Sequence, residues 1–436
     1  MTEEQIASLE EAVVDFLRPF RVCFKQERGF GHLRTYSIGL LTDLKRKSVE
    51  PIALAAGKDE RVLQWFLSDM QWDDPLAQDV LQRRVADRPG GWEAIGVIDS
   101  SGHPKRGDKT PGVQRQWCGQ VGKTDNCVVG QHLLWTDNHP QNPFSCMLAS
   151  DLFLPEDWGN DRERCRAAGI PDDVVHRVKW QIAVTQVTQA LGNGVRFDWL
   201  VFDSEYGSVP HFWFALDRLG MRAVGEVRSD FHAWATPPAC RSGRAEHTSH
   251  HVKDLARHSP VFTKQPWQEV TVKTHTRGKT RWKVKAALVQ LVREHKNPGP
   301  SVPTDRRYWL IVAHNPKTDE TKYLVSNAPA STSVKTLMRI MFTRWHVEKW
   351  FERAKQEAGL GAFEVRTYQS LTRHWLICRI VMLCLAEQTQ RLRGEKSGDH
   401  LRAGGRGGQR GSVVALEASG PLPPNPVPDS LVPSAA

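Results

Sequence analysis

The sequence predicts an α/β protein built around a mixed β-sheet with helices on both faces. Two observations lead to this prediction. Between residues 89 and 230, the hydrophobic pattern gives three strands in succession and then alternating helices and strands. On either side of this region the pattern changes, with helical periodicity over 1–88 and alternating basic and apolar residues over 231–330. We therefore expect an N-terminal helical domain before the sheet and an antiparallel β insertion within it.

The composition limits the classes of protein and partner. A chain of 436 residues is too long for one ordinary core, and its formal net charge of +10 suits a polyanionic partner such as nucleic acid. No apolar run reaches the roughly 18 residues of a membrane span, so no membrane partner is expected. The eight cysteines form no Cys-x-x-Cys pair, which favours reduced thiols in a cytoplasmic protein over a disulfide or zinc framework.

The N-terminal region, residues 1–88, has the pattern of several amphipathic helices. Apolar residues recur at helical spacing over 6–17 and again over 60–72. Between them, residues 34–57 are interpreted as two short helices interrupted near Pro51. The basic residues of this stretch are Lys45, Arg46, Lys47 and Lys58. Two interpretations stay open, a DNA-binding domain or a helical bundle whose basic face is simply solvated.

The first strands of the sheet follow in close succession. A short apolar run at 94–98 predicts a strand that delivers Asp99 at its end. After a loop rich in glycine, proline and basic residues, two more strands are expected at 126–136 and 145–155. The predicted sheet therefore begins with three strands in a row, without an intervening helix.

The next segment alternates between helix and strand. Pro171 and Asp172 are expected to open a long helix that closes at Gly192. The apolar run 199–202 predicts a buried strand that delivers Asp203 at its C-terminal end. One further helix and one further strand complete the pattern. Three consecutive strands followed by alternating helices and strands is the order of an RNase H-like fold.

The chain after residue 230 divides into three parts. Residues 231–330 predict the β insertion, with a turn at Gly278 and a face rich in lysine and arginine. Residues 331–390 predict two helices that return to complete the sheet domain. Residues 391–436 are rich first in glycine and arginine and then in proline, which predicts a disordered tail because such a composition cannot build a core.

One stretch of the C-terminal part, residues 341–361, has the length and pattern of a single helix. Arg344, Glu348 and Lys355 are spaced by four and then by seven residues. These steps return nearly to the same angle, so the three side chains share one helix face. Such a face is either a solvated ladder of ion pairs or a carboxylate flanked by phosphate-binding cations.

Three carboxylates are predicted to meet. If the first and fourth strands are parallel neighbours, their carboxyl ends share one edge, which brings Asp99 and Asp203 together, and the late helix can place Glu348 over them. Three converging carboxylates repel one another and need cations. Two divalent ions, Mg²⁺ or Mn²⁺, held about 4 Å apart would neutralise them, activate a water or a 3′-hydroxyl, and stabilise the leaving oxygen of a phosphodiester.

Basic side chains near these acids would hold DNA phosphates. The predicted DNA- or phosphate-binding residues are Arg344, Lys355, Lys105, Arg106, Lys279 and Arg281. Each assignment has a structural alternative, because an Asp after a strand is commonly a turn or helix-cap residue and a charged helix face is commonly solvated. The combination favours chemistry, since each acid falls where one topology requires it.

These residues resemble those of the DDE transposases of bacterial insertion sequences, in the group marked by a Tyr-x2-Arg-x3-Glu-x6-Lys signature. Arg344, Glu348 and Lys355 match that spacing, while Met341 occupies the tyrosine position. The stretch VIDSSGHPKRG resembles the family's region around its first Asp, and VFDSEYG resembles the region around its second, which gives these roles to Asp99 and Asp203. The resemblance covers most of the chain except its tail.

The resemblance implies a transposase that binds transposon ends, cleaves DNA by metal-dependent phosphodiester hydrolysis and joins the 3′-hydroxyl to target DNA. It further implies double-stranded DNA as partner, a homodimer on that DNA and a nucleoid-associated location in the bacterial cytoplasm. In relatives, an aromatic side chain of the β insertion holds a flipped base. The corresponding residues here are Trp234, Trp267 and Trp282, with core packing as the alternative for each.

Two other functions fit the same pattern. A metal-dependent DNA nuclease on this fold would cut DNA without joining it. A catalytically inactive relative would only bind DNA, although the presence of all three acids weighs against it.

Overall fold

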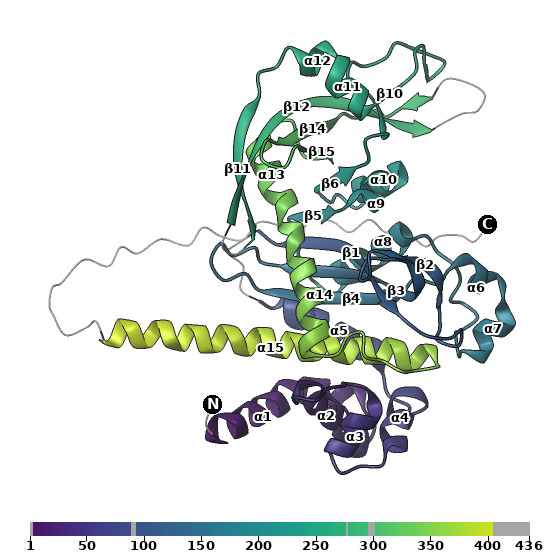
Figure 1. The fold of residues 1–436 in the computed structure, drawn as a ribbon, viewed down its shortest axis with the longest axis vertical. Coiled ribbons are helices and arrows are strands. Elements are labelled where there is room, and N and C mark those ends of the chain that lie inside the picture. Colours follow the sequence, from purple (N-terminus) through teal and green to yellow (C-terminus); the bar gives the residue numbers. More distant parts are fainter. Residues whose placement is uncertain (1–2, 89–92, 276–277, 295–300, 404–436) are drawn as a thin grey trace. The chain divides into compact units, whose positions relative to one another are not determined.

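The computed structural model describes four stretches of the chain, residues 3–88, 93–275, 278–294 and 301–403 (Figure 1). Contacts divide the chain into two units, Met1–Gln390 and Arg391–Ala436. The description that follows concerns the first unit, except for the end of the last helix. Within the described stretches, no helix combines the length and apolarity that crossing a membrane requires.

The N-terminal region folds as helices, as its periodicity predicts. They are α1 Glu3–Leu17, the 3₁₀ helix η1 Arg18–Cys23, α2 Glu27–Leu41, α3 Val49–Ala55, α4 Glu60–Ser68 and α5 Asp74–Ala86. The side chains of Asp59 and Asp73 cap α4 and α5. The break expected near Pro51 lies instead at residues 42–48, because a proline in the first turn of a helix removes no intrahelical hydrogen bond.

The central sheet has the predicted RNase H-like order. Its strands are β1 Ile95–Pro104, β2 Gln114–Cys118, β3 Lys123–Thr136, β4 Ser145–Leu152, β5 Trp199–Phe202 and β6 Ala223–Val227. They lie in the order β4-β3-β1-β5-β6, with β3 antiparallel to both its neighbours and β1, β5 and β6 parallel (Figure 1). Strand β2 was not predicted and forms a hairpin with β3.

Strand β1 is longer than predicted. It pairs with β5 only over Ile95–Ile98, the four apolar residues that the sequence indicates. Its polar second half continues to Pro104 because β3 extends far enough to pair with all ten residues. The expected end at Ile98 was therefore the end of one pairing and not of the strand.

Helices cover the sheet between these strands. They are α6 Glu156–Asn160, α7 Arg162–Ala167, α8 Lys179–Gly192, α9 Ser204–Gly207 and α10 Pro210–Arg218. The helix expected to open at Pro171 begins only at Lys179. Asp172 is instead held by Arg162 and Arg166 of α7, at 3.3 and 3.2 Å, so tertiary contacts take this segment out of the helix.

The β insertion is antiparallel, as predicted, and is continuous with the central sheet. Its elements are β7 His232–Trp234, β8 Cys240–Arg241, β9 Arg244–Ala245, β10 His250–His251, α11 Val252–His258, α12 Pro260–Thr263, β11 Gln268–His275, β12 Gly278–Glu294, β13 Val302–Pro303, β14 Tyr308–Asn315 and β15 Glu320–Ser326. Strand β15 pairs with β6, which joins the strand order β12-β14-β15 directly to β6-β5-β1. The insertion is thus held by a shared hydrogen-bond ladder rather than by a flexible linker.

The chain then returns through α13 Val334–Met341, η2 Phe342–Arg344, α14 Trp345–Glu357 and α15 Tyr368–Ala403. The single helix predicted over 341–361 is therefore the end of α13, a 3₁₀ turn and α14. Gly359, with φ of +63°, follows the end of α14. Helix α15 continues past residue 390, where the disordered tail was expected to begin, and residues 404–436 of that tail lie outside the described stretches.

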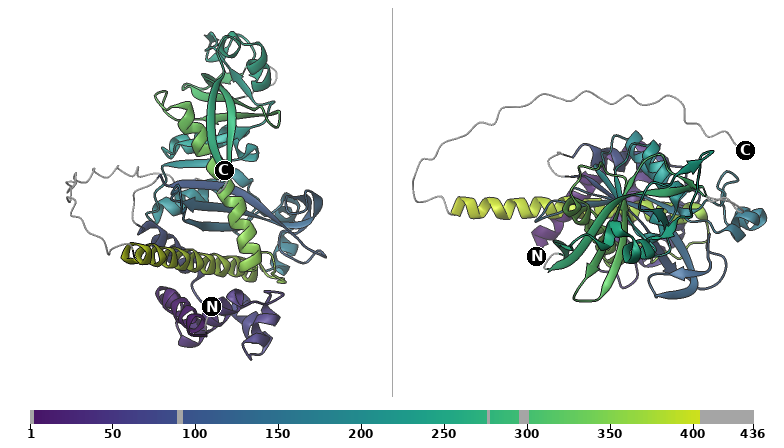
Figure 2. Two further views of the ribbon diagram at one scale, coloured as in Figure 1. Left: turned by 60° about the vertical axis from the view of Figure 1, so that its left-hand side comes forward. Right: turned by 90° about the horizontal axis from the view of Figure 1, so that it is seen from above.

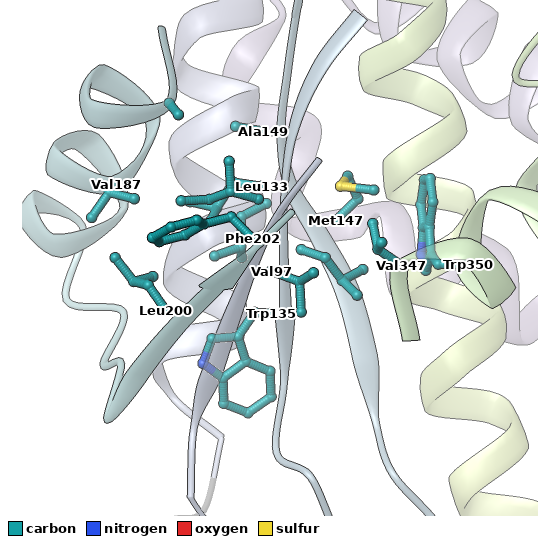
Figure 3. Close-up of a cluster of buried hydrophobic side chains, with 14 of the residues drawn as sticks. Val97, Leu133, Trp135, Met147, Ala149, Val187, Leu200, Phe202, Val347 and Trp350 are labelled. Atoms are coloured by element: carbon teal, nitrogen blue, oxygen red, sulfur yellow. The ribbon is translucent and has the colours of Figure 1, made fainter. Parts of the chain in front are cut away.

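Two helices sandwich the sheet. Val187 of α8 lies on one side of the strands, and Val347 and Trp350 of α14 lie on the other, with Val97 and Leu133 between them (Figure 3). All five side chains belong to one continuous buried core. The face under α14 is the one on which Asp99 and Glu348 are bridged by Arg344.

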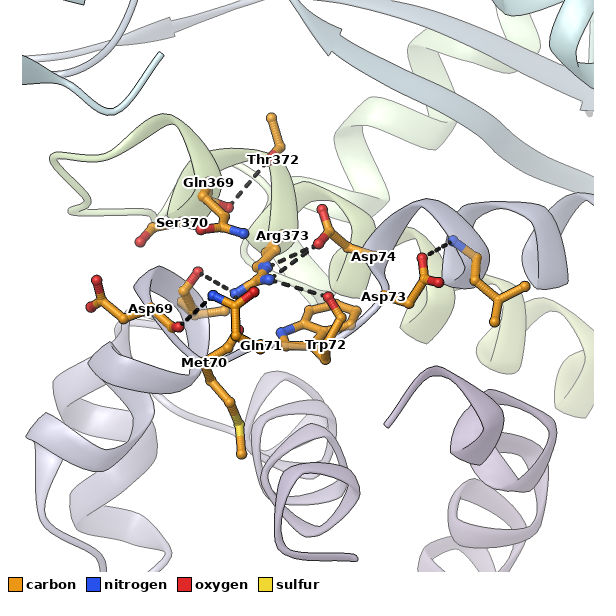
Figure 4. A network of polar contacts seen from close by, with 12 residues as sticks. Asp69, Met70, Gln71, Trp72, Asp73, Asp74, Gln369, Ser370, Thr372 and Arg373 are labelled. Atoms are coloured by element: carbon orange, nitrogen blue, oxygen red, sulfur yellow. Dashed lines mark hydrogen bonds and ion pairs between the residues drawn. The ribbon is translucent and has the colours of Figure 1, made fainter. Parts of the chain in front are cut away.

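The N-terminal helices are fastened to α15 by a buried arginine. Arg373 donates to the carbonyl of Met70 at 2.9 Å and pairs with Asp74 at 3.1 Å (Figure 4). Its side chain is 1% exposed. Because a buried guanidinium is costly unless its donors are satisfied, this contact fixes the segment between α4 and α5 against α15.

Candidate active site

Asp99 lies in the middle of β1, at the point where this strand loses its parallel neighbour. The last parallel pair joins Ile98 with Phe202, so Asp99 and Asp203 are the next residues of two adjacent strands. Along its other edge, Asp99 is opposite His132 of β3. The predicted parallel pairing of the first and fourth strands is confirmed, and it puts the two acids at the same level of the sheet.

Asp203 ends β5 and caps the short helix α9. Its Oδ1 atom accepts a hydrogen bond from the backbone N–H of Glu205 at 2.9 Å. Asp203 is therefore a helix-cap residue, which is the structural alternative that the sequence left open for it. Its other oxygen, Oδ2, accepts no hydrogen bond from the residues that the structure describes, so capping orients the carboxylate and leaves one oxygen for another partner.

Arg344 links the acid of β1 to the acid of α14. Its Nη1 donates to Oδ2 of Asp99 at 3.0 Å, and its Nη2 donates to Oε1 of Glu348 at 2.6 Å. Arg344 was predicted to contact phosphate, and in this structure its donors face carboxylates instead. The pairing explains how Glu348, in the first turn of α14, is drawn over the edge of the sheet where Asp99 lies.

The acids perturb one another electrostatically. Burial, opposed in part by Arg344 and reinforced by Asp203 and Glu348, raises the pKa of Asp99 to about 7. Burial and the neighbouring Glu205 likewise raise the pKa of Asp203. Burial acts to lower the pKa of Arg344, but the facing carboxylates outweigh it and raise that pKa above its ordinary value. Carboxylates this costly to ionise together are stabilised by added positive charge.

The donor chemistry of the three acids suits a hard divalent cation, although no three ligands are yet arranged around one point. Among the described residues, no group of three His, Cys, Asp or Glu side chains is placed to hold one metal ion. The cation between Asp99 and Glu348 is the Arg344 guanidinium. Carboxylate oxygens that converge on a positive charge are the ligands that Mg²⁺ and Mn²⁺ prefer.

A second ionic cluster, which the sequence analysis did not single out, lies on the opposite face of β1. Lys179, at the start of α8, pairs with Oε1 of Glu205 at 2.6 Å and approaches Oγ of Ser100 at 3.4 Å. Ser100 follows Asp99, and Glu205 lies two residues after Asp203. The cluster therefore ties together the backbone segments that carry the two acids. The sequence signal was present in DSS and DSEYG, but the lysine comes from a separate helix.

The lysines and arginine predicted to contact DNA have different environments. Lys355 is half-buried on the α14 face, burial lowers its pKa, and within the described stretches it pairs with no carboxylate. Arg106 is exposed in the loop after β1. Lys105 is committed to the fold, since its Nζ donates to the carbonyls of Gly361 and Phe363 at 3.1 and 2.6 Å and burial lowers its pKa to about 8.

The residues of the β insertion that were predicted to contact DNA also differ from one another in exposure. Lys279 is exposed, and Arg281 is exposed but lies 3.7 Å from Glu269. Trp234 and Trp282 are buried core residues, so the packing alternative holds for both. Trp267 is 45% exposed and remains accessible to a base. Burial of a strand tryptophan depends on which face the tertiary structure covers, which alternation alone does not decide.

Buried histidines lie beneath α14. His132 packs against Phe351, and burial lowers its pKa to about 3. His374 of α15 joins Tyr36 of α2 at 2.9 Å and the carbonyl of Gly359 at 3.1 Å, and burial lowers its pKa to about 4. These rings are neutral parts of the scaffold under the signature helix.

Comparisons with known proteins identify the family of this chain. The family described as DDE superfamily endonuclease matches residues 19–285, more than half of the chain, a span that includes Asp99 and Asp203. A probable transposase for insertion sequence element IS701 from Microchaete diplosiphon is 25% identical over 383 residues, which cover 86% of this chain and 87% of that protein. The solved synaptic complex of piggyBac transposase with hairpin DNA has a TM-score of 0.41 and 12% identity, covering 89% of this chain and 74% of that one.

Proposed function

Because the chain belongs to the DDE superfamily endonucleases, we propose that it is a transposase that binds transposon ends, cleaves them and joins the 3′-hydroxyl to target DNA. The observation that best supports this proposal is the arginine bridge, in which Asp99 and Glu348 share the Arg344 guanidinium beside Asp203. Acids from one strand and from a helix far along the chain thus share one positive charge, and carboxylates with perturbed pKa values are concentrated at functional sites.

Asp99, Asp203 and Glu348 would hold two divalent ions, Mg²⁺ or Mn²⁺. When bound, such ions supply the activation of the attacking oxygen and the stabilisation of the leaving oxygen. The cap on Oδ1 leaves Oδ2 of Asp203 as the free ligand. Ionised carboxylates are needed, so protons would compete with the ions at Asp99 and Asp203, whose pKa values are both raised.

Arg344 would take two roles in succession. Its guanidinium gathers Asp99 and Glu348 and opposes their repulsion. Once other cations neutralise these acids, its donors become available to a phosphate oxygen, the partner that a planar guanidinium fits best. Lys355, half-buried and without a carboxylate partner in the described part of the chain, would hold a second phosphate further along α14.

The proposed partner is double-stranded DNA, which the chain would engage as a homodimer, and the proposed location is the bacterial nucleoid. An attack by a free 3′-hydroxyl requires no covalent bond between protein and DNA, in keeping with a site that is built from carboxylates and cations.

A strand-transfer assay tests the proposal. The full chain is incubated with Mg²⁺, a precut duplex that carries a free 3′-hydroxyl at the element's end, and a supercoiled target. Covalent joining of the end to the target is the expected result. Cutting of DNA without any joining would identify a nuclease on the same scaffold and contradict the transposase proposal.

A further inference from the structure

A basic hollow lies between the β11–β12 hairpin and α13, apart from the three acids. It has a volume of about 440 Å³ and is lined by Thr271, Val272, Lys279, Lys335, Thr336 and Arg339. The hairpin and α13 lie side by side in Figure 1 and in the left-hand view of Figure 2. None of the hollow's residues except Lys279 was singled out from the sequence.

The charge of the hollow is largely unopposed. Lys279 and Lys335 are exposed, and neither forms an ion pair with any described residue. Arg339 pairs with Glu93 at 2.5 Å, which leaves the hollow with at least two free cationic groups. Lysines from separate elements that face one space without carboxylates repel one another, and an anion between them would relieve that repulsion.

The remaining lining suits an oxyanion. The Thr271 and Thr336 hydroxyls can donate hydrogen bonds, and the only apolar side chain of the lining is Val272. Thr336 lies in the first turn of α13, whose N-cap is Ser333. The cationic groups and hydroxyls that border this open hollow are donors that fit a phosphate group.

A continuous helical segment joins the hollow to the acids. Helix α13 leads directly through η2 into α14, so Arg339 lies five residues before Arg344 in a continuous run of helix. Trp282 of β12 packs against Phe342 of η2, with ring centroids 5.2 Å apart, which fastens the hairpin to the same connection. An anion in the hollow would therefore be held at a fixed place relative to the acids.

We propose that this hollow binds a backbone phosphate of the DNA whose cleavage is proposed above. The inference rests on the proposed function for the identity of its ligand. It assigns Lys335, Thr336 and Arg339 to DNA binding together with Lys279. Hydroxyls and cations read only the phosphate, so this contact sets the position of the DNA and carries no sequence preference.

Salt dependence of DNA binding tests the inference. Affinity of the full chain for an end duplex is measured over a range of KCl concentrations, with EDTA present, for wild type and for the double variant Lys279→Ala/Lys335→Ala. The matched control is Lys264→Ala/Lys317→Ala, which removes two exposed lysines of the same β-rich region. The hollow variant should bind about tenfold more weakly, and its slope of log affinity against log salt should fall by about 1, since one phosphate contact is lost. The control should keep the wild-type slope.

Two further arms separate the possible sources of failure. Lys279→Arg/Lys335→Arg should restore the slope, because charge and not shape is required. An unchanged slope in the alanine variant would overturn the inference. The inference would also be overturned if inorganic phosphate bound the hollow in a thermal-shift titration while the alanine substitutions left the salt slope of DNA binding unchanged. The ligand of the hollow would then be a free anion. Asp203→Asn, assayed for cleavage in the same preparation, tests the catalytic proposal independently.

Discussion

Two arginines from the last part of the chain are enclosed by opposite kinds of partner. The guanidinium of Arg373 faces mainly neutral carbonyls, those of Met70 and Trp72 at 2.9 and 3.4 Å, with Asp74 as its one carboxylate (Figure 4). Among the residues that the structure describes, the ion-pair and hydrogen-bond partners of the Arg344 guanidinium are carboxylates. The Arg373 side chain is 1% exposed and that of Arg344 is 26% exposed.

The two environments shift the pKa in opposite directions. Burial, only partly offset by Asp74, lowers the pKa of Arg373, whereas facing carboxylates raise that of Arg344 against the effect of burial. The carbonyl groups around Arg373 accept hydrogen bonds from its guanidinium and cannot easily obtain them from another donor. Carboxylates around Arg344 can be satisfied by any cation, including a divalent metal. The comparison assigns one arginine to the fold and the other to the site.

The largest expected effect is at the site. Asp203→Asn keeps the cap to α9 but removes a charged ligand, so it should lower metal-dependent cleavage by on the order of 10³-fold or more while end binding stays nearly intact. Cleavage is measured as single-turnover nicking of an end duplex, and binding by electrophoretic mobility shift. Undiminished cleavage by this variant would remove Asp203 from the site.

The two arginines should differ in their effect on stability. Arg373→Met leaves several carbonyls and Asp74 without a donor and should lower the free energy of unfolding by about 3–5 kcal/mol. Arg344→Met should lower it by less than about 1 kcal/mol, because Asp99 can take up a proton instead, yet it should abolish cleavage. Urea denaturation of both variants checks this, and equal losses of stability would erase the distinction between the two regions.

Two buried histidines should make the stability of the fold depend on pH. His132 and His374 have pKa values of about 3 and about 4 in the folded protein, lowered by burial, against an ordinary value of 6.5. Below pH 6.5 the unfolded chain binds more protons at these rings, so each histidine contributes a loss of stability of about 2 kcal/mol between pH 7 and pH 5, and the raised pKa of Asp99 contributes a gain over the same range. Urea denaturation at pH 7 and pH 5 measures the difference.

The control for this pH dependence is His258→Gln, which changes an exposed histidine and should leave the dependence unchanged. His374→Gln should reduce it by the share of one buried ring. A pH dependence that is the same in His374→Gln as in wild type would contradict the neutral, buried state of this histidine.

The smallest expected effects separate two lysines that the sequence placed in one class. Lys355→Ala should reduce the salt slope of DNA binding by about 1 and leave stability within about 0.5 kcal/mol. Lys105→Ala removes the donor to the carbonyls of Gly361 and Phe363, so it should cost about 1–2 kcal/mol of stability and leave the slope unchanged. The opposite outcome would exchange their roles.

The sequence predicts those elements whose pattern is local. Strand β5 falls where predicted, Trp199–Phe202, because a buried parallel strand reads as one apolar run that ends at a polar residue. The second half of β1 and all of β2 escape prediction, since both owe their extended form to the long partner β3. The early start predicted for α8 fails because α7 binds Asp172, a contact between separate helices.

The same difference between local patterns and long-range contacts applies to the candidate site. Strand ends and helix spacing are local, and they are sufficient to propose Asp99, Asp203 and Glu348 as site residues without any knowledge of distance. The pairing of Arg344 with Asp99 spans 245 residues of sequence, and that of Lys179 with Glu205 depends on where α8 begins. The burial of Trp234 and Trp282, and the anchoring of Lys105, also depend on surfaces that only the folded chain brings together.

We propose that Asp99, Asp203 and Glu348 bind divalent metal at the place where Arg344 supplies the positive charge in this structure. Anomalous scattering from Mn²⁺ in crystals of the full chain bound to an end duplex is the decisive experiment. Two peaks bounded by the three carboxylates are expected, with the Arg344 guanidinium turned from Asp99 and Glu348 toward a phosphate. Peaks elsewhere, with both Arg344 ion pairs intact, would contradict it.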